Sequence, residues 1–463
     1  MGSSFVRTAQ KNLARPKKRT DTAVDLEDRN ILVEDADIWN GIGFRRGSIL
    51  IEEGRIKRIA RSIPKSGIET IDGSGLKALP GLIDVHVHLR DMRLAHKEDF
   101  ATGTAAAAAG GFTTVLDMPN TLPATDSASH LLEKQTVAAQ KIYVNTGFHA
   151  AAVSNSHDLE GLAEAGAFSF KLYLPKPIAP FDVQNDQVIE KMMRAAARVE
   201  TPVTVHAEDL SAGENTSKGD GFEELAEVRS SILETRAIDR LLPIQKKARC
   251  NVHYCHLTLP ASLAKINATS RSTSEVTPHH LLLSKKLLSR IGWKAWMVPP
   301  LRSEQTRRSL LDSTLTGLAS VIASDHAPHI ITEKDQSASK SPPGVPGLET
   351  TLPLMLTLVN RQQMNLSLLV RLLSENPARI FGLKSKAKLW KGADGDLVLI
   401  DLKKKSRIDS SKFFSKAKFS PFDGSKTQGA VHSTIVGGRL VYKEAEIVTR
   451  EGSGFVLRSR PSD

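Results

Sequence analysis

The sequence predicts an α/β protein, a (β/α)8 TIM barrel with a small β-sandwich domain formed from both ends of the chain. Three observations support this fold. Short β-like runs alternate with helical stretches from about residue 78 to 383, and strand and hairpin patterns precede and follow that region. The chain of 463 residues is also long enough for one large domain and an appended one. An open doubly wound sheet is the alternative, but no Gly-x-Gly-x-x-Gly loop follows any run.

The small domain is predicted from two segments, residues 29–78 and 384–452. In the first segment, apolar and polar residues alternate on both sides of Glu53-Gly54, which is typical of a β-hairpin. In the second segment, residues 396–400 and 433–442 show the same alternation. We therefore expect the two segments to meet in one small sandwich.

The barrel is predicted over residues 79–383. Parallel strands that are buried on both faces have continuous apolar sequences, and helices rich in Ala, Leu, Glu and Arg separate them here. The eight predicted strands are 82–89, 113–118, 142–148, 167–174, 202–206, 251–257, 274–277 and 319–325.

Composition and charge argue against several classes of protein. Half of the net charge of +12 comes from residues 1–20, so we interpret residues 1–28 as a basic disordered tail and residues 453–463 as a C-terminal tail. The other basic residues lack the interleaved aromatic residues of a nucleic-acid surface, and no apolar run is long enough to span a membrane. The two cysteines, Cys250 and Cys255, are not spaced as a disulfide framework, which favours a reducing, cytoplasmic compartment.

Polar side chains gather at the ends of the predicted strands. The carboxyl ends of barrel strands carry the active site in this fold. Because strand side chains alternate between two faces, the two histidines of the first strand share a face, with Arg90 beyond them as an anion ligand. Imidazole and carboxylate groups suit zinc or a similar first-row metal. The candidate metal ligands are His86, His88, His206, His256 and Asp325.

A lysine lies inside the fourth predicted strand. Lys171 is flanked by Phe170 and Leu172, and an isolated buried ammonium is strongly disfavoured. The residues alone leave open a lysine whose head reaches solvent, a Schiff-base lysine and a base of lowered pKa. A neutral amine can also react with carbon dioxide to form a carbamate, which can bridge two metals.

Several motifs together resemble those of a known family. They are Pro80-Gly81-Leu82-Ile83-Asp84-Val85-His86-Val87-His88-Leu89-Arg90, Asp117-Met118-Pro119-Asn120-Thr121, Lys171-Leu172-Tyr173-Leu174, Asp325-His326-Ala327-Pro328-His329, residues 344–350 and Asn376-Pro377-Ala378-Arg379. With them the chain resembles the metal-dependent amidohydrolase superfamily, and within it the dihydroorotases, from about residue 30 to 445.

The resemblance implies a site with two Zn²⁺ ions per subunit, or another first-row divalent metal. It assigns His86, His88 and Asp325 to one metal, His206 and His256 to the other, and N6-carboxylated Lys171 to the bridge between them.

The resemblance also implies how substrate binds. It places Arg90, Asn120 and His329 on the substrate carboxylate, with the backbone of Pro346 and Gly347 closing over the ring. Relatives often have Asn where this chain has Val298, so one auxiliary substrate contact differs.

The implied activity is reversible cyclisation of N-carbamoyl-L-aspartate to L-dihydroorotate plus water, a step of pyrimidine (UMP) biosynthesis. In the hydrolytic direction a metal-bridging hydroxide would attack the ring carbonyl, and Asp325 would carry its proton to the leaving nitrogen. The implied partner is this small anionic substrate, without nucleic acid or membrane. A homodimer and an association with another pyrimidine-pathway enzyme are both open.

Two other functions are compatible with the fold. An allantoinase or hydantoinase would act on a neutral ring and leave the guanidinium of Arg90 unpaired. A non-catalytic scaffold would need neither the imidazoles nor the buried lysine.

Three further residue features carry expectations. We expect Cys255 to point away from the site. Glu275 matches a glutamate that in some relatives contacts a further metal, but an ion-pair partner is the preferred interpretation. Residues 331–345 are expected to form a mobile loop, and both a lid and a surface excursion are open.

Overall fold

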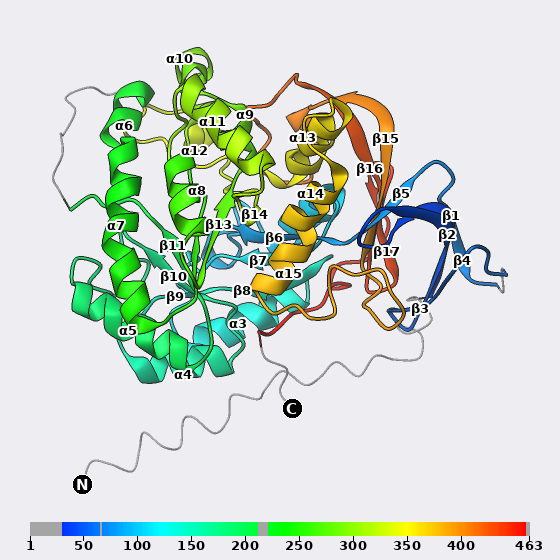
Figure 1. The fold of residues 1–463 in the computed structure, drawn as a ribbon, viewed down its shortest axis with the longest axis horizontal. Coiled ribbons are helices and arrows are strands. Elements are labelled where there is room, and N and C mark those ends of the chain that lie inside the picture. Colours follow the sequence, from blue (N-terminus) through cyan, green and yellow to red (C-terminus); the bar gives the residue numbers. More distant parts are fainter. Residues whose placement is uncertain (1–29, 65–66, 212–220, 460–463) are drawn as a thin grey trace, which may run out of the picture.

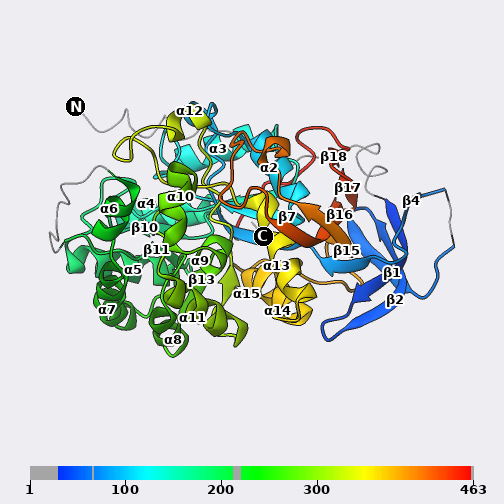
Figure 2. The same cartoon turned by 90° about the horizontal axis from the view of Figure 1, so that it is seen from above.

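The computed structural model describes residues 30–64, 67–211 and 221–459 (Figure 1). The predicted basic tail of residues 1–28 lies outside the described residues, as do residues 460–463 of the predicted C-terminal tail. A body of strands and helices lies beside a long twisted sheet, and the view from above separates the two (Figure 2).

Eight parallel strands form the centre of the larger body, and each overlaps one of the eight predicted runs. They are β6 (Leu82–Val87), β7 (Phe112–Asp117), β8 (Asn145–Phe148), β10 (Phe170–Tyr173), β11 (Val203–His206), β12 (Val252–Tyr254), β13 (Ser272–Val276) and β14 (Val321–Ile322). A short extra strand, β9 (Ala150–Ala151), continues β8 after one residue and pairs with β10.

Helices alternate with these strands, as expected of an α/β fold. The helices are α2 (Phe100–Ala109), α3 (Ala128–Ala139), α4 (Ser156–Glu164), α5 (Asp186–Arg198), α6 (Phe222–Val228), α7 (Ser231–Ala248), α8 (Pro260–Asn267), α9 (Pro278–Leu282), α10 (Leu288–Ile291), α11 (Glu304–Leu315), α12 (Ile331–Lys334), α13 (Leu348–Asn360), α14 (Leu366–Val370) and α15 (Asn376–Ile380).

Strand pairing follows the order of the chain. The two runs of neighbours are β6-β7-β8 and β9-β10-β11-β12-β13-β14. A parallel bridge between Val87 and His326 and a hydrogen bond of 2.8 Å from His88 N to His326 O bring the first strand beside the chain that leaves β14. The first and last strands of the predicted barrel are therefore neighbours.

Both chain segments predicted for the small domain contribute to one nine-stranded sheet. Its order is β18-β17-β16-β15-β5-β1-β2-β3, with β4 paired to β1. The strands are β1 (Ile31–Trp39), β2 (Phe44–Glu52), β3 (Arg55–Ala60), β4 (Glu69–Asp72), β5 (Lys77–Pro80), β15 (Leu397–Arg407), β16 (Lys426–Val436), β17 (Arg439–Lys443) and β18 (Glu446–Ile447). The two segments join where β5 pairs antiparallel with β15. A sandwich of two facing sheets stays a prediction.

The predicted hairpin at Glu53-Gly54 connects β2 and β3. Both turn residues have left-handed backbone, with φ of 52° and 76°, which is the conformation that a two-residue hairpin loop requires.

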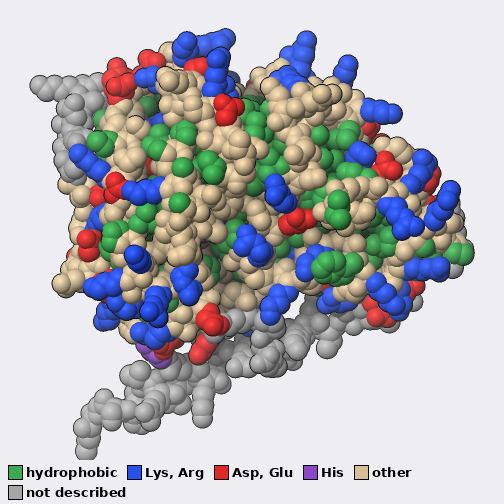
Figure 3. All heavy atoms as spheres, viewed as in Figure 1, with side chains coloured by type: hydrophobic (Ala, Val, Ile, Leu, Met, Phe, Trp, Pro, Cys, Tyr) green, Lys and Arg blue, Asp and Glu red, His purple; other side chains and the backbone are tan. Residues whose placement is uncertain are grey.

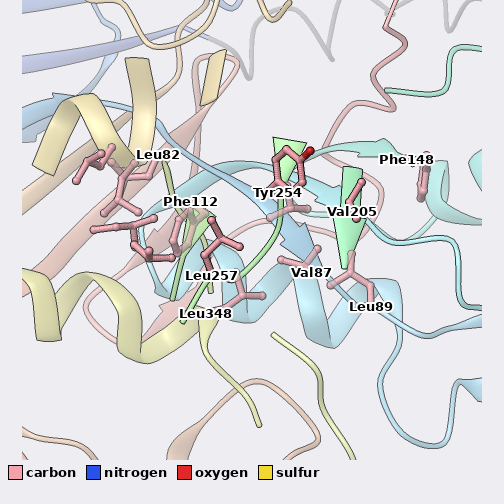
Figure 4. Close-up of a cluster of buried hydrophobic side chains, with 14 of the residues drawn as sticks. Leu82, Val87, Leu89, Phe112, Phe148, Val205, Tyr254, Leu257 and Leu348 are labelled. Carbon is pink, nitrogen blue, oxygen red and sulfur yellow. The ribbon is translucent and has the colours of Figure 1, made fainter. Parts of the chain in front are cut away.

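The main hydrophobic cluster fills the space between the strands and the helices around them (Figure 4). Phe112, Val205, Tyr254 and Leu257 are at most 1% exposed, and Leu348 at the start of α13 packs with them. This apolar packing fixes the strand ends that carry the polar site.

The predicted C-terminal tail is part of the folded body over residues 453–459. Phe455 O accepts a hydrogen bond of 2.8 Å from Thr146 N, and Leu457 N donates to Thr146 O at 2.8 Å. Because β10 pairs with β9 and not with β8, the outward backbone groups of Thr146 are open to this segment.

Charged side chains are interspersed on the visible face. Figure 3 shows Lys and Arg over much of this face, with Asp and Glu between them and no single continuous basic stripe. In the described part of the chain, no helix is both long and apolar enough to cross a membrane.

A buried ion pair ties the small sheet to the barrel strands. Lys386 Nζ lies 2.5 Å from Asp396 Oδ2 and 2.9 Å from Asp394 Oδ2. Asp396 also accepts hydrogen bonds from Asn145 Nδ2 on β8 (2.9 Å) and from Gly437 N (2.6 Å). One carboxylate therefore connects three distant segments.

Replacing Lys386 with methionine leaves the carboxylate of Asp396 buried without its cation, whereas Asp394 keeps its ion pair with Arg55. We therefore expect Lys386→Met to lower the free energy of unfolding by about 3 kcal/mol. The measurement is urea unfolding followed by circular dichroism. The matched control is Lys391→Met, an exposed lysine nearby, which should change stability by less than about 0.5 kcal/mol. Equal stability of the two variants would contradict the role of the pair.

Candidate metal centre and substrate cavity

A cavity of about 440 Å³ opens at the carboxyl ends of the parallel strands. It brings together the side chains predicted as metal ligands and three of those predicted to bind substrate. These lining residues are His86, His88, Arg90, Asn120, Lys171, His206, His256, Asp325 and His329.

Two histidines of β6 face the same carboxylate. Asp325 Oδ1 lies 3.4 Å from His86 Nε2 and 3.3 Å from His88 Nε2. The other ring nitrogens are held from behind, since His86 Nδ1 bonds Glu275 and His88 Nδ1 donates to Asn120 Oδ1 at 2.7 Å. Such outer partners fix the tautomer and direction of a ligating imidazole, so both Nε2 atoms are free for a metal.

A second pair of imidazoles faces the same cavity from β11 and the end of β12. His206 Nδ1 and His256 Nε2 are 3.0 Å apart, and His206 Nε2 lies 2.6 Å from Glu208 Oε2. Arg229 Nη1 forms an ion pair with Glu208 Oε2 at 2.8 Å. Two nitrogens converging from separate strands are a suitable donor pair for a metal.

Lys171 reaches the cavity between these two groups. It is 4% exposed, and its Nζ lies 3.0 Å from Cys255 Sγ. Among the described residues it forms no ion pair with a carboxylate. A buried amine without an anionic partner fits a lysine that acquires its own negative group.

The protonation states of three of the four imidazoles suit metal binding. Burial lowers the pKa of His88 to about 4 and also lowers the pKa values of His206 and His256, so these imidazoles are neutral near pH 7. Burial opposes a charge on His86, but the carboxylate of Glu275 raises its pKa to about 10, so a metal at His86 Nε2 would displace a proton. Burial opposes ionisation of Asp325, but the charge of His86 holds its pKa below the usual range. Neutral imidazoles with a carboxylate are a donor set that fits zinc and similar divalent metals.

A cationic corner lies beside the metal ligands. Arg90 is 8% exposed, its Nη2 lies 3.4 Å from His329 Nε2, and its Nε donates to Pro328 O at 3.4 Å. In the described ranges, no carboxylate lies within ion-pair distance of this guanidinium. The cavity therefore offers a planar cation to an anionic ligand.

Three residues that line the cavity have left-handed backbone, which directs their side chains into it. The φ angles are 57° at Arg90, 35° at His256 and 46° at Asp325. Non-glycine residues rarely adopt this region, and such strain concentrates at functional sites.

The expectation that Cys255 points away from the site was wrong. Its thiol contacts Lys171, and it is 1% exposed. Strand β12 ends at Tyr254, and the left-handed turn at His256 breaks the alternation on which the expectation depended. Glu275 is an ion-pair partner as expected, since it contacts His86 and accepts from His253 Nε2 at 3.0 Å.

Pro346 and Gly347 do not line the cavity, in contrast to the sequence prediction; residues 342–344 do. Gly347 N donates to His326 Nδ1 at 3.1 Å, behind the cavity wall. The parallel bridge between His326 and Val345 holds residues 345–347 against the chain that follows β14, away from the cavity. At Gly344, with φ of 137°, an added Cβ would lie 2.5 Å from Ala327 O, so glycine is needed for the turn.

Sequence reasoning missed Glu208 and Tyr173. Glu208 holds His206, and the ring of Tyr173 lies 4.3 Å from the ring of His206. The signal for Glu208 was its position two residues after His206, on the same side of an extended chain.

Comparisons with known proteins place the chain in a family. The model of the Amidohydrolase family matches residues 78–441. A dihydroorotase of Methanothermobacter thermautotrophicus is 38% identical over 415 residues, covering 88% of this chain and 93% of the relative. A dihydroorotase of Bacillus cytotoxicus is 36% identical over 86% of this chain and 95% of the relative.

Solved structures show the same architecture. The L-hydantoinase (dihydropyrimidinase) of Arthrobacter aurescens superposes with a TM-score of 0.88 at 30% identity, covering 93% of this chain and 99% of that one. The D-hydantoinase (dihydropyrimidinase) of a Thermus species has a TM-score of 0.84 at 25% identity, over 92% and 98% of the two chains. With the relatives matched along most of their length, the chain belongs to the amidohydrolase family, among the dihydroorotases, and is a hydrolase of cyclic amides.

Proposed function

We propose that the chain catalyses the reversible cyclisation of N-carbamoyl-L-aspartate to L-dihydroorotate plus water, in pyrimidine biosynthesis. The observation that carries the proposal is the buried guanidinium of Arg90, which has no carboxylate partner among the described residues and lies beside the metal ligands. A cyclic amide with a ring carboxylate satisfies that cation while its amide bond lies at the metal centre. The dihydroorotase relatives support the same reading.

The proposal includes two Zn²⁺ ions, or another first-row divalent metal. The residues that would hold them are His86, His88 and Asp325 for one, His206 and His256 for the other, and carboxylated Lys171 between them. When bound, such metals supply a water of lowered pKa and polarise the carbonyl group of the substrate. The neutral imidazoles of His88, His206 and His256 support this assignment, as does the amine of Lys171, which contacts the Cys255 thiol and forms no ion pair with a carboxylate among the described residues.

Asp325 is the proposed proton carrier. Its ionised carboxylate can accept a proton from the attacking water and deliver it to the ring nitrogen as the amide bond breaks. In cyclisation the same group takes the proton from the carbamoyl nitrogen. The side chain lies on the cavity wall, within 3.4 Å of both β6 imidazoles, where a reacting amide would be held.

Arg90, Asn120 and His329 are proposed to orient the substrate. Because the carbonyl oxygen of Asn120 is occupied by His88, its amide hydrogens are left for the substrate carboxylate. Residues 342–344 would cover the ring in place of Pro346 and Gly347.

We also infer that the eight parallel strands close into a barrel. The bridge from Val87 to His326 and the continuation of β8 into β9 support closure at both junctions. Closure would bring the ends of five strands, β6, β10, β11, β12 and β14, around one metal centre. A cytoplasmic location and a homodimer or a complex with another pyrimidine-pathway enzyme belong to the same proposal.

Hydantoinase activity is the second candidate, favoured by the similarity to the Arthrobacter aurescens L-hydantoinase structure. A neutral ring would leave Arg90 unpaired, so we rank it below the dihydroorotase reaction.

The proposal is tested by assaying the purified, zinc-reconstituted protein, supplied with bicarbonate, on L-dihydroorotate, hydantoin, allantoin and dihydrouracil. We expect turnover of L-dihydroorotate alone and about two zinc ions per chain by elemental analysis. Turnover of a neutral ring without turnover of L-dihydroorotate would move the assignment to the hydantoinases. Absence of bound metal would favour a scaffold.

Arg90→Met should raise the KM for L-dihydroorotate by about a hundredfold, because a charge-assisted hydrogen bond contributes roughly 1.5–3 kcal/mol. Bound zinc should be unchanged, since Arg90 is not among the proposed ligands. The exposed Arg93 is the matched control, and Arg93→Met should keep the wild-type KM. A wild-type KM in Arg90→Met would remove the carboxylate clamp from the model.

Asp325→Asn should lower kcat by roughly 10³-fold or more, since an amide cannot carry the proton and proton transfer contributes about 10²–10⁴-fold. Some zinc should remain, held by the four histidines. Asp312→Asn, at an exposed site on α11, controls for the chemical change. Substantial residual turnover would exclude Asp325 as the proton carrier.

A further inference from the structure

A buried lysine lies outside the metal centre and the cationic corner. Lys334, the last residue of α12, is 0% exposed. Its Nζ donates to Trp296 O at 3.0 Å and to Pro342 O at 2.8 Å, and it lies 5.8 Å from the centre of the Phe419 ring. Within the described chain, no carboxylate lies within ion-pair distance of it.

The two carbonyl groups belong to the two segments that wall the substrate cavity. Trp296 directly precedes the lining residues 297–298, and Pro342 begins the lining residues 342–344. These segments are far apart in the sequence, and the Lys334 amine holds their backbones at one point.

Other hydrogen bonds close the same junction. Gly344 N donates to Trp296 O at 3.0 Å, and Trp296 Nε1 donates to Ser341 O at 3.2 Å. Ser341 Oγ donates to Lys334 O at 2.8 Å. Helix α12 begins two residues after His329. The hydrogen bonds around Lys334 therefore also set the position of His329, a proposed substrate ligand, relative to residues 297–298.

Burial of the Lys334 amine is unfavourable for the stability of the fold. Burial lowers the pKa of Lys334 to about 7, which means that the protonated form is disfavoured in the folded chain. A methionine of similar length would fill the space without a buried charge, but it would leave Pro342 O without its Lys334 donor. These two effects on stability oppose each other. The hydrogen bonds of Lys334 are therefore better explained by cavity shape than by stability.

We infer that Lys334 is a positioning residue of the substrate cavity, whose Nζ clamps Trp296 O and Pro342 O so that residues 297–298 and 342–344 keep the spacing that fits the substrate ring. It touches neither the proposed metal ligands nor Arg90. The identity of the ring rests on the proposed function, whereas the clamp is a property of the wall.

The test compares Lys334→Met with the wild type. We expect the KM for L-dihydroorotate to rise about tenfold, kcat to stay within about threefold, bound zinc to be unchanged, and stability in urea at pH 7 to be about equal, because the lost hydrogen bond offsets the removal of the buried amine. Lys340→Met, at an exposed lysine in the same segment, is the matched control and should keep the wild-type KM.

A second readout does not depend on substrate. Amide hydrogen exchange, followed by mass spectrometry, should be faster in residues 296–298 and at Ser341, Gly344 and Val345 of Lys334→Met and unchanged in Lys340→Met. Wild-type exchange together with a wild-type KM would overturn the inference. A loss of stability or a failure to fold would also overturn it, because both would make Lys334 a residue of the fold.

The two proposals fail in different ways. If the wild type cleaves another cyclic amide, the KM comparison is made on that substrate, and the clamp is retained or lost on its own result. If the wild type turns over L-dihydroorotate but Lys334→Met changes neither the amide exchange nor the KM, the proposed activity is retained and the positioning role of Lys334 is rejected.

Discussion

The carboxylate of Glu275 is the interaction on which the metal centre depends. It lies on β13 and contacts His86 Nδ1 on β6, His253 Nε2 on β12 and the backbone N–H of His256. One buried anion thus sets the direction of two proposed ligands from two strands. Its burial is favourable only because all these donors meet it, so the strands must be in register before the site can form. The packing of Phe112, Val205 and their neighbours provides that register.

The sequence predicted the parallel strands and the helices between them because buried parallel strands and helices have distinct patterns. For the same reason it placed the side chains of His86 and His88 on one face, since they alternate along one strand, and both line the cavity. Where the backbone leaves the extended region, this alternation ends, and a left-handed turn at His256 brought Cys255 to Lys171. Residues 453–459 carry no strand pattern, because their partner at Thr146 is set by tertiary structure.

Fold and specificity are carried by different parts of the molecule. The hydantoinase structures share the architecture at TM-scores of 0.84–0.88, so the shape of the body does not distinguish substrates. Within the cavity, the proposed discrimination comes from a single planar cation with no internal anion. A ligand with a carboxylate forms an ion pair with Arg90. A neutral ring excludes water from the guanidinium without forming that ion pair, so its binding is less favourable.

The pairing of β5 with β15 also has a consequence for synthesis of the chain. Leu79 and Val398 are partners in the small sheet, and the whole barrel sequence lies between them. At a ribosomal rate of about 5–20 residues per second, the edge of β5 waits on the order of half a minute for its partner. During that time an apolar strand edge is exposed to other nascent chains. The small sheet is therefore completed last, and a slow or stalled ribosome on the barrel segment would prolong the period in which this chain is prone to aggregate.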